Sequence, residues 1–233
     1  MMILSMDTST YVLGTAIGTN SEIVAEWTTY KKENHSLRLM PGIDEVMNQA
    51  NLEMKNLTGI VVTTGPGSYT GVRIGVATAK AMASSLDIPL YEVSSLELLA
   101  QNGKYTSTVI CPFIDARRGQ VYAGLYESND GEVSQIREDE LVLMSDLLKE
   151  LDTLERNVLF LSLDLENHKE QIQEVLGERA IFGGATDNRT KPSEMIHLAS
   201  KKDAATNVDT VVPRYLQLAE AEKNIQKESR DDG

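Results

Sequence analysis

Residues 65–71, Gly-Pro-Gly-Ser-Tyr-Thr-Gly, are the stretch on which the fold assignment depends. They follow an apolar run typical of a buried strand, and they precede a segment up to about residue 86 that has the composition of a helix. Glycines so closely spaced let the backbone turn tightly and let another group approach it closely. The order strand, glycine-rich turn, helix therefore predicts an α/β unit over residues 60–80.

The glycine-rich turn admits two interpretations, which the residues alone leave equally open. Backbone amides at such a turn and at a helix N-terminus attract anions, so Gly65, Gly67 and Ser68 are candidate nucleotide- or phosphate-binding residues, with Arg73 adding positive charge nearby. The segment is not a Walker loop, because no Gly-Lys-Ser or Gly-Lys-Thr follows it. The alternative is a turn that serves only close packing of the helix.

Outward from this unit, the same series of elements occurs twice. Period-two and apolar runs predict strands, and apolar residues at helical spacing predict helices. In the first half we expect strands at residues 3–7, 12–18, 23–30, 57–63 and 89–93, and helices at 36–50, after the glycine turn, and from a serine cap at 94 or 95 to 100. In the second half we expect strands at 108–115, 120–127, 133–137, 158–163 and 180–182, and helices at 145–154, 166–176 and 192–202. A C-terminal helix is expected at 215–225.

The position of Pro41 and the repeated order of strands and helices complete the fold prediction. Pro41 fits poorly inside a helix that begins at Ser36, so that helix starts later or is kinked. Each half reads βββαβα, which predicts an α/β protein of duplicated actin-like, ribonuclease-H-like (ASKHA) lobes, each with a mixed sheet. We expect the first lobe at residues 1–104 plus 197–226, the second at 105–196, and a disordered tail at 227–233.

Composition and charge restrict the function. The chain has 233 residues, a formal net charge of −13 and one cysteine. The acidic charge opposes direct binding of nucleic acid, so tRNA would have to be held through another protein. A single cysteine excludes an intrachain disulfide, and Cys111 is expected to be a small buried side chain. With no apolar run long enough to cross a bilayer and no signal-like start, we expect a cytoplasmic protein without membrane contact.

The candidate cleft residues lie where the first strand of each half ends. Asp7, Thr8 and Ser9 follow one strand, and Asp115 ends its counterpart. In actin-like kinases such carboxylates face the cleft and hold a metal-nucleotide. The alternative is an aspartate that accepts hydrogen bonds from turn amides. The pairing across the repeat favours the functional interpretation, with carboxylates that lie outside the core.

No set of catalytic residues can be identified elsewhere in the sequence. His35, His168 and His197 lie far apart in sequence, and none has the spacing of a metal site, so no metal ligand is predicted. We interpret His35 as a surface or capping residue. A stand-alone ATPase or small-molecule kinase remains the alternative function, with residues 183–186, Gly-Gly-Ala-Thr, as a weak candidate for adenosine contact. A protease is disfavoured, because the sequence shows no nucleophile and general base at a recognisable spacing.

Residues 65–80 resemble the corresponding motif of the bacterial TsaB family, also called YeaZ. Further segments that resemble this family are residues 6–9, 34–36, 93–97 and 115–122, so the resemblance is concentrated in the first half of the chain. It implies a non-catalytic scaffold and dimerisation subunit of the complex that forms N6-threonylcarbamoyladenosine at position 37 of tRNAs reading ANN codons. The implied partners are a catalytic TsaD-like paralogue and a TsaE-like ATPase.

The resemblance also bears on cofactors. In TsaD-like chains, metal-binding histidines follow the strand after the glycine-turn helix, whereas Ser94 and Ser95 occupy this place here. Serine does not replace an imidazole ligand, so we expect no cofactor bound by this chain alone. ATP or ADP would belong to the interface of the complex.

The first lobe is the predicted dimerisation surface, and the chain is expected to form a homodimer when alone. The helix after the glycine turn carries small residues all round, which let another helix approach closely. The preceding helix carries an apolar stripe with adaptable methionines. The predicted interface residues are Met40, Ile43, Met47, Arg73, Val76, Ala79, Lys80 and Ala83.

Overall fold

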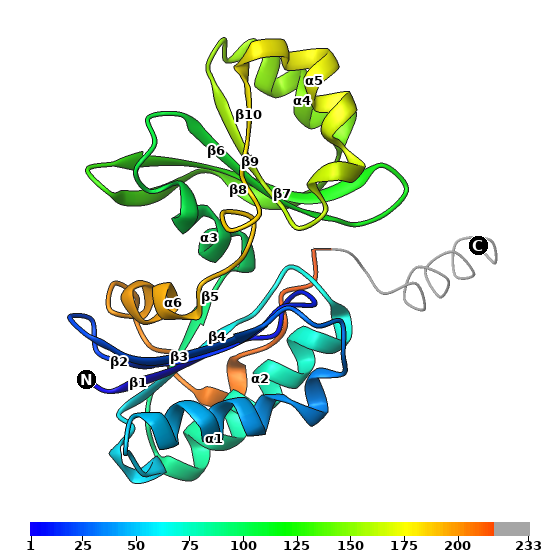
Figure 1. The fold of residues 1–233 in the computed structure, drawn as a ribbon. Helices are drawn as coiled ribbons and strands as arrows, with labels where there is room; N and C mark the ends of the chain where they lie inside the picture. Colours follow the sequence, from blue (N-terminus) through cyan, green and yellow to red (C-terminus); the bar gives the residue numbers. More distant parts are fainter. Residues whose placement is uncertain (217–233) are drawn as a thin grey trace, which may run out of the picture.

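The computed structural model describes residues 1–216, which form two lobes stacked one above the other (Figure 1). Each lobe contains one five-stranded sheet, ordered β3-β2-β1-β4-β5 in the first and β8-β7-β6-β9-β10 in the second. In both, the first strand pairs antiparallel with the second and parallel with the fourth. The predicted α/β class with two actin-like lobes of mixed sheets is therefore confirmed.

The first lobe is a sheet covered on both faces. Its strands are β1 (Ile3–Asp7), β2 (Leu13–Gly18), β3 (Ile23–Thr29), β4 (Gly59–Thr63) and β5 (Leu90–Val93). Leu4 and Met6 of β1 face α1 (Leu39–Gln49) and α2 (Tyr69–Leu86), whereas Ile3 packs with α6 (Pro192–Ala199). Because β1 is buried on both faces, its sequence is a short apolar run rather than an alternating one.

The second lobe repeats this arrangement. Its strands are β6 (Val109–Asp115), β7 (Gln120–Asn129), β8 (Glu132–Leu143), β9 (Val158–Leu161) and β10 (Ala180–Phe182). One face packs against α4 (Met144–Thr153) and α5 (Lys169–Leu176), and the other against α3 (Ser95–Ala100). Single 3-10 turns lie at His35–Leu37, Met54–Asn56, Gln101–Gly103, Leu165–Asn167, Gly177–Arg179 and Val208–Thr210.

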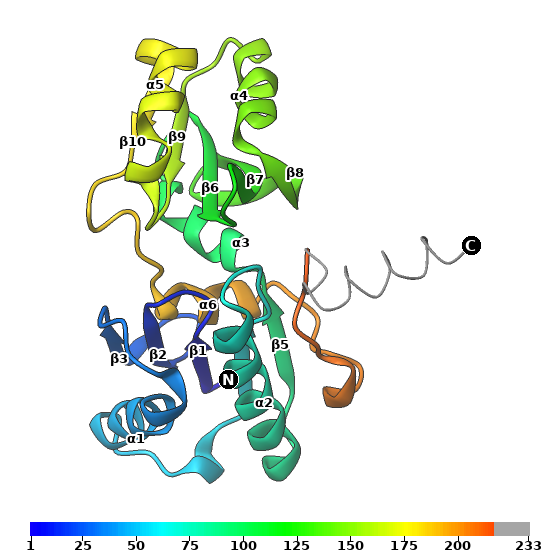
Figure 2. The same cartoon turned by 90° about the vertical axis from the view of Figure 1, so that its right-hand side faces the viewer.

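The two lobes exchange their last helices. Helix α3 follows the strands of the first lobe but packs on the second sheet, and α6 follows the strands of the second lobe but packs on β1 and β2. Both helices lie between the two sheets in two perpendicular views (Figures 1 and 2). The predicted boundaries at residues 104/105 and 196/197 need correction, because residues 95–100 pack in the second lobe and residues 192–196 in the first.

Local chemistry explains where the elements differ from the prediction. Helix α1 begins at Leu39 rather than Ser36, so Pro41 lies in its first turn, where a missing amide proton costs nothing. Strand β8 extends well beyond the predicted end at residue 137, through Asp139. The predicted strand is too short because acidic residues hide the β pattern of this segment. The predicted C-terminal helix and the tail at 227–233 lie, from residue 217 on, outside the described part of the chain.

Five of the eight predicted interface side chains lie in the core of the first lobe, so their prediction as contacts for a partner is wrong. A helix that covers a sheet must point its apolar stripe inward. In α1 and α2 that stripe packs against the sheet and is not available to a partner. Of the remaining three, Met40 and Arg73 are exposed, and Lys80 donates to the carbonyls of Asp209 (2.8 Å) and Val211 (3.0 Å). The five core residues are Ile43, Met47, Val76, Ala79 and Ala83.

Helix α2 gives a direct test of this burial. Val76 is buried in the core of the first lobe, and its neighbour Ala77 is exposed. We expect Val76→Glu to lower the free energy of unfolding by about 3 kcal/mol or more, because it buries an unpaired carboxylate. The matched control Ala77→Glu should change it by less than about 0.5 kcal/mol. Urea unfolding monitored by circular dichroism measures both, and similar stability of the two variants would contradict the assignment.

None of the helices within residues 1–216 combines the length and the apolar character that crossing a bilayer requires.

Candidate functional site

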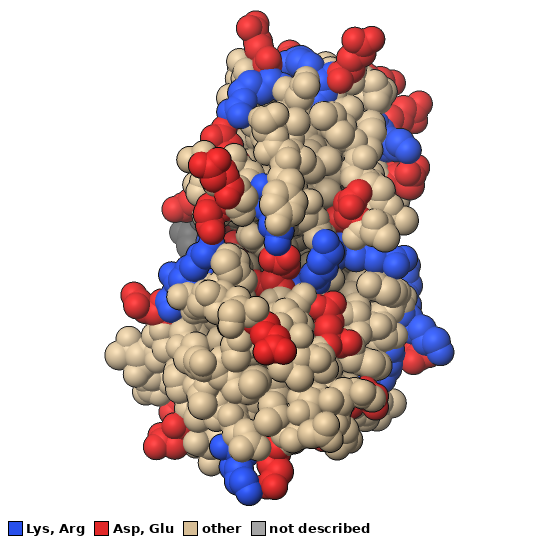
Figure 3. Space-filling model, turned by 60° about the vertical axis from the view of Figure 1, so that its left-hand side comes forward, with Lys and Arg blue, Asp and Glu red and all other residues tan. Residues whose placement is uncertain are grey.

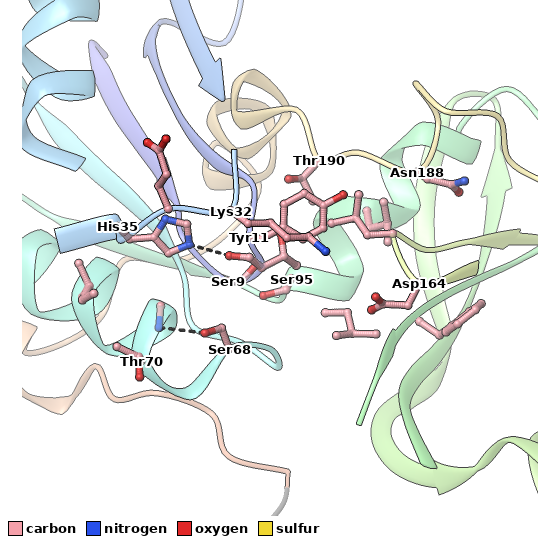
Figure 4. A pocket seen from close by; sticks show the side chains of 18 of the residues that line it. Ser9, Tyr11, Lys32, His35, Ser68, Thr70, Ser95, Asp164, Asn188 and Thr190 are labelled. Carbon is pink, nitrogen blue, oxygen red and sulfur yellow. Dashed lines mark hydrogen bonds between the residues drawn. The ribbon is translucent and has the colours of Figure 1, made fainter. Parts of the chain in front are cut away.

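A cavity of about 550 Å³ lies between the two lobes. Its walls come from the β1–β2 turn, the segment before α1, the first turns of α2, helix α3, the end of β6, and the segments after β9 and before α6. Figure 4 shows His35 and Ser68 on the side of the first lobe, Asp164 and Asn188 on the side of the second, and Ser95 between them. The cavity therefore depends on how the exchanged helices set the lobes apart.

Asp7 does not face this cavity. Its side chain is fully buried, and both oxygens accept hydrogen bonds from protein groups. Oδ1 accepts from the amide (3.0 Å) and hydroxyl (2.7 Å) of Ser9 and from the hydroxyl of Thr63 (2.9 Å), and Oδ2 accepts from the hydroxyl of Thr190 (2.7 Å). The prediction of a cleft-facing carboxylate outside the core is wrong for Asp7, because β1, β4 and the segment before α6 enclose it.

The glycine-rich turn packs against the turn that follows β1. A Cβ atom on Gly67 would lie 2.1 Å from the carbonyl oxygen of Ser9, and one on Gly71 would lie 2.2 Å from that of Thr8. The Ser68 amide donates to the Ser9 carbonyl at 2.7 Å. The packing interpretation of these glycines is therefore the one that the structure favours.

Three further hydrogen bonds tie the turn to the rest of the protein. The Ser68 hydroxyl accepts from the Gly71 amide at 3.2 Å and caps α2, and the Gly65 carbonyl accepts from the Ser95 amide at 3.0 Å. The Thr8 hydroxyl donates to the Gly71 carbonyl at 2.7 Å. Of the seven predicted nucleotide-binding residues, Ser9 and Ser68 line the cavity, whereas Asp7, Thr8, Gly65, Gly67 and Asp115 do not.

Asp115 lies beside the cavity, at the end of β6, and is partly exposed. Its Oδ1 accepts from the Arg117 amide at 3.0 Å and lies 3.3 Å from Nε2 of His168. The His168 ring is itself buried and stands edge-on to Phe113, with 5.6 Å between the ring centroids. Asp115 therefore organises the β6–β7 turn, as the turn interpretation of the sequence proposed.

His35 is buried rather than a surface residue, so that interpretation is corrected. Its Nε2 lies 2.7 Å from the carbonyl oxygen of Thr10, which requires the proton on Nε2. Its Nδ1 is buried and has no hydrogen-bond partner among the described residues. His197 instead lies at the surface, with Nδ1 2.9 Å from Oδ1 of Asn20.

Metal and thiol chemistry find little support in these side chains. Within residues 1–216, no three histidine, cysteine or acidic side chains are placed to hold a metal ion. Cys111 is fully buried, as expected, and burial raises the pKa of its thiol to about 12. A thiol with such a pKa is not a nucleophile at neutral pH.

Ser94 is the N-cap residue of α3. The Ser94 hydroxyl accepts from the amides of Leu96 (3.2 Å) and Glu97 (3.4 Å) and donates to the carboxylate of Asp139 on β8. The buried Asp139 also accepts from the Tyr126 hydroxyl at 2.6 Å, and burial together with this carboxylate raises the pKa of Tyr126. The burial of Asp139 could not be predicted, since an acidic run in a hairpin gives no sign of burial.

Ion pairs connect the two lobes. On the face shown in Figure 3, lysine and arginine side chains gather between the lobes beside acidic ones. Lys104 pairs with Glu194 of α6 at 2.7 Å, and Lys201 pairs with Glu132 of β8. The first pair is partly exposed and the second is exposed, and both supplement the buried contacts of α3 and α6 in holding one lobe on the other.

The buried Asp7 provides a comparison with its counterpart Asp115. Asp7→Ala leaves the hydroxyls of Thr63 and Thr190 without their acceptor in a closed space, so we expect a loss of about 3 kcal/mol or more in the free energy of unfolding. Asp115→Ala removes a partly exposed acceptor and should cost about 1 kcal/mol or less. Urea titrations measure both, and an Asp7→Ala variant as stable as the parent chain would refute the buried hydrogen-bond cluster.

Comparisons with known proteins fit this fold. A family model described as TsaD, tRNA N6-adenosine threonylcarbamoyltransferase, matches residues 22–225. The chain is 48% identical over 222 residues to the tRNA threonylcarbamoyladenosine biosynthesis protein TsaB of Bacillus subtilis, covering 95% of this chain and 96% of that one. It is 30% identical over 152 residues to TsaB of Escherichia coli K12, covering 64% of this chain and 65% of that one.

Two solved structures from Pseudomonas aeruginosa share the fold. One is described as an uncharacterized protein with similarity to peptidase YeaZ, and it superposes with a TM-score of 0.80 at 22% identity over 93% of this chain and 99% of that one. The other, YeaZ, gives a TM-score of 0.76 at 21% identity over 92% of this chain and 99% of that one. At such identities the likeness concerns the fold alone.

Proposed function

Because the chain belongs to the TsaB family of tRNA threonylcarbamoyladenosine biosynthesis proteins, we propose that it is the non-catalytic scaffold subunit of the complex that makes this modification. The modified nucleoside is N6-threonylcarbamoyladenosine at position 37 of tRNAs that read ANN codons. The catalytic subunit is a TsaD-like paralogue, and a TsaE-like ATPase joins the pair. All of this takes place in the cytoplasm.

The burial of the Asp7 carboxylate is the observation that supports the non-catalytic role. A metal-nucleotide clamp of the actin-like kind needs carboxylate oxygens that face the cleft. Both oxygens of Asp7 instead accept hydrogen bonds from hydroxyls and an amide in the core, and a serine pair begins α3. A stand-alone ATPase or kinase is therefore the weaker alternative.

Partner binding then falls to the exposed parts of the first lobe. The segment before α1 and the first turns of α1 and α2 present Leu37, Met40, Tyr69 and Arg73, which we call the pairing surface. Leu37 is 74% exposed, and the Arg73 guanidinium lies 3.9 Å from the centre of the Tyr69 ring. Apolar and aromatic side chains with an arginine are the composition of protein interfaces.

The pairing surface also explains homodimer formation, whereas tRNA and nucleotide are bound through the complex. A paralogue with the same lobe offers an equivalent surface, so a pseudo-two-fold pair forms, and in its absence two copies of this chain form a homodimer. With a net charge of −13, this chain holds tRNA only through the complex. ATP or ADP binds at the interface of the complex rather than to this chain alone.

Charge placed on the pairing surface tests the proposal. We expect the double variant Leu37→Glu and Met40→Glu to remain folded, because both side chains are exposed, and to weaken pairing with the paralogue at least about tenfold. The control is Leu154→Glu, which charges an apolar side chain on the second lobe that is 38% exposed, close to the 43% of Met40. Mass in solution with and without the paralogue measures pairing.

The same variants are then introduced into a bacterial strain that lacks its own TsaB gene, and threonylcarbamoyladenosine in total tRNA is measured by mass spectrometry. We expect the parent chain and the Leu154→Glu control to restore the modification and the double variant to fail. If the parent chain itself restores nothing, the proposed function is wrong. If the double variant pairs and restores normally, the pairing surface lies elsewhere.

A further inference from the structure

The segment that follows α6 returns to the first lobe and ends beside the pairing surface. Residues 205–215, which we call the strap, begin where the Ala205 amide donates to the Leu90 carbonyl of β5 at 2.8 Å. Val211 is fully buried in the core of the first lobe, and Lys80 of α2 donates to its carbonyl at 3.0 Å. Figure 2 shows this segment, in orange, beside β5 and α2. These contacts fix the strap on the first lobe.

The end of the strap packs on the first turns of α2. The centre of the Tyr215 ring lies 5.1 Å from that of Tyr69, and the Tyr215 hydroxyl accepts from Nε of Arg73 at 2.5 Å. Tyr69 and Tyr215 are nevertheless 46% and 45% exposed. Since Tyr69 and Arg73 belong to the pairing surface, Tyr215 extends that surface with a second aromatic ring of the kind that protein interfaces favour.

Arg214, one residue earlier, contacts the second lobe. Its amide donates to the Thr64 carbonyl at 2.7 Å, and its Nη1 lies 3.9 Å from Oδ2 of Asp139 on β8. The Asp139 side chain is fully buried. A buried carboxylate is costly without a cation nearby, and Arg214 supplies the cation that pairs with Asp139 within residues 1–216. The end of the strap is therefore tied to the junction between the lobes.

Both lobes meet the strap at this point. Gly67 of the glycine-rich turn, Tyr69 of α2 and Tyr122 of β7 line one small gap of about 20 Å³ together with Arg214 and Tyr215. Because Arg214 and Tyr215 share a peptide unit, the ion pair at the lobe junction restrains the position of the ring on the pairing surface. The alternative is a strap that only covers the first lobe.

We propose that the strap links the pairing surface to the junction between the lobes. Tyr215 is a contact residue for the partner, and Arg214 is a positioning residue that acts through Tyr215 because Asp139 holds it. The partner is the TsaD-like paralogue, so this inference rests on the proposed function. The partner side chains that meet Tyr69 and Tyr215 are apolar or aromatic, since two half-exposed rings offer a flat apolar surface.

Calorimetric titration of the full chain with the purified paralogue tests the contact residue. We expect Tyr215→Ser to weaken pairing at least about tenfold, while the urea unfolding curve stays that of the parent because the ring is half exposed. The control Tyr105→Ser removes a ring that is 87% exposed between α3 and β6, and it should leave the affinity unchanged. A Tyr215→Ser variant that pairs as tightly as the parent would overturn the contact role.

Arg214 separates positioning from contact, because its guanidinium faces the lobe junction. Arg214→Gln should weaken pairing about fivefold, and Arg214→Lys, which keeps the cation, should recover most of the affinity. Asp139→Asn should have an effect similar to that of Arg214→Gln, and the double variant should pair no more weakly than either, since both remove one ion pair. Unchanged pairing of Arg214→Gln, or effects of the two substitutions that add, would overturn the positioning role.

The parent chain separates this inference from the proposed function. If the parent pairs with the paralogue and restores the modification, and the strap variants do so equally well, the inference fails and the proposed function stands. If the parent forms only a homodimer, the proposed function fails and the same variants are measured on the homodimer. There, tenfold weaker self-association of Tyr215→Ser supports the strap, and unchanged self-association overturns it. A parent chain that stays monomeric with and without the paralogue overturns both.

Discussion

The buried carboxylate of Asp7 is the constraint on which the rest of the structure depends. It joins four parts of the chain: the end of β1, the turn at Ser9, the end of β4 through Thr63, and the entry to α6 through Thr190. A buried charge is tolerated only when its hydrogen bonds are complete, so these segments must meet at one point. The position of the β1–β2 turn then fixes the glycine-rich turn, whose glycines leave room for the carbonyl oxygens of Thr8 and Ser9.

This arrangement links the fold to the cavity. Thr190 anchors the segment that returns from the second lobe, and α6 then covers the first sheet while α3 covers the second. The lobes are therefore joined by exchanged helices and by the contact of Ser94 with Asp139. A core that closes over the strand-end aspartate while leaving a cavity between the lobes agrees with a scaffold that retains the shape of an actin-like enzyme.

The sequence predicted what depends on neighbouring residues. The extent of α2, the serine cap of α3 and the strands of the repeat follow from local spacing, and the structure has them close to the expected positions. The burial of Asp7 could not be predicted, because its partner Thr190 lies 183 residues further along the chain. Val76 was misplaced for a related reason: small residues all round a helix do not reveal which side the sheet covers.

The central claim is that Asp7 and the glycine-rich turn form a structural cluster and not a metal-nucleotide clamp. Calorimetric titration of the purified chain with ATP, in the presence and in the absence of Mg²⁺, tests it most directly, because a clamp of this kind binds the metal together with the phosphates. The account predicts that the purified chain binds no ATP, with or without Mg²⁺, and that no ATP is hydrolysed. An affinity that rises about tenfold or more with Mg²⁺, together with turnover that Asp7→Asn abolishes, would contradict it.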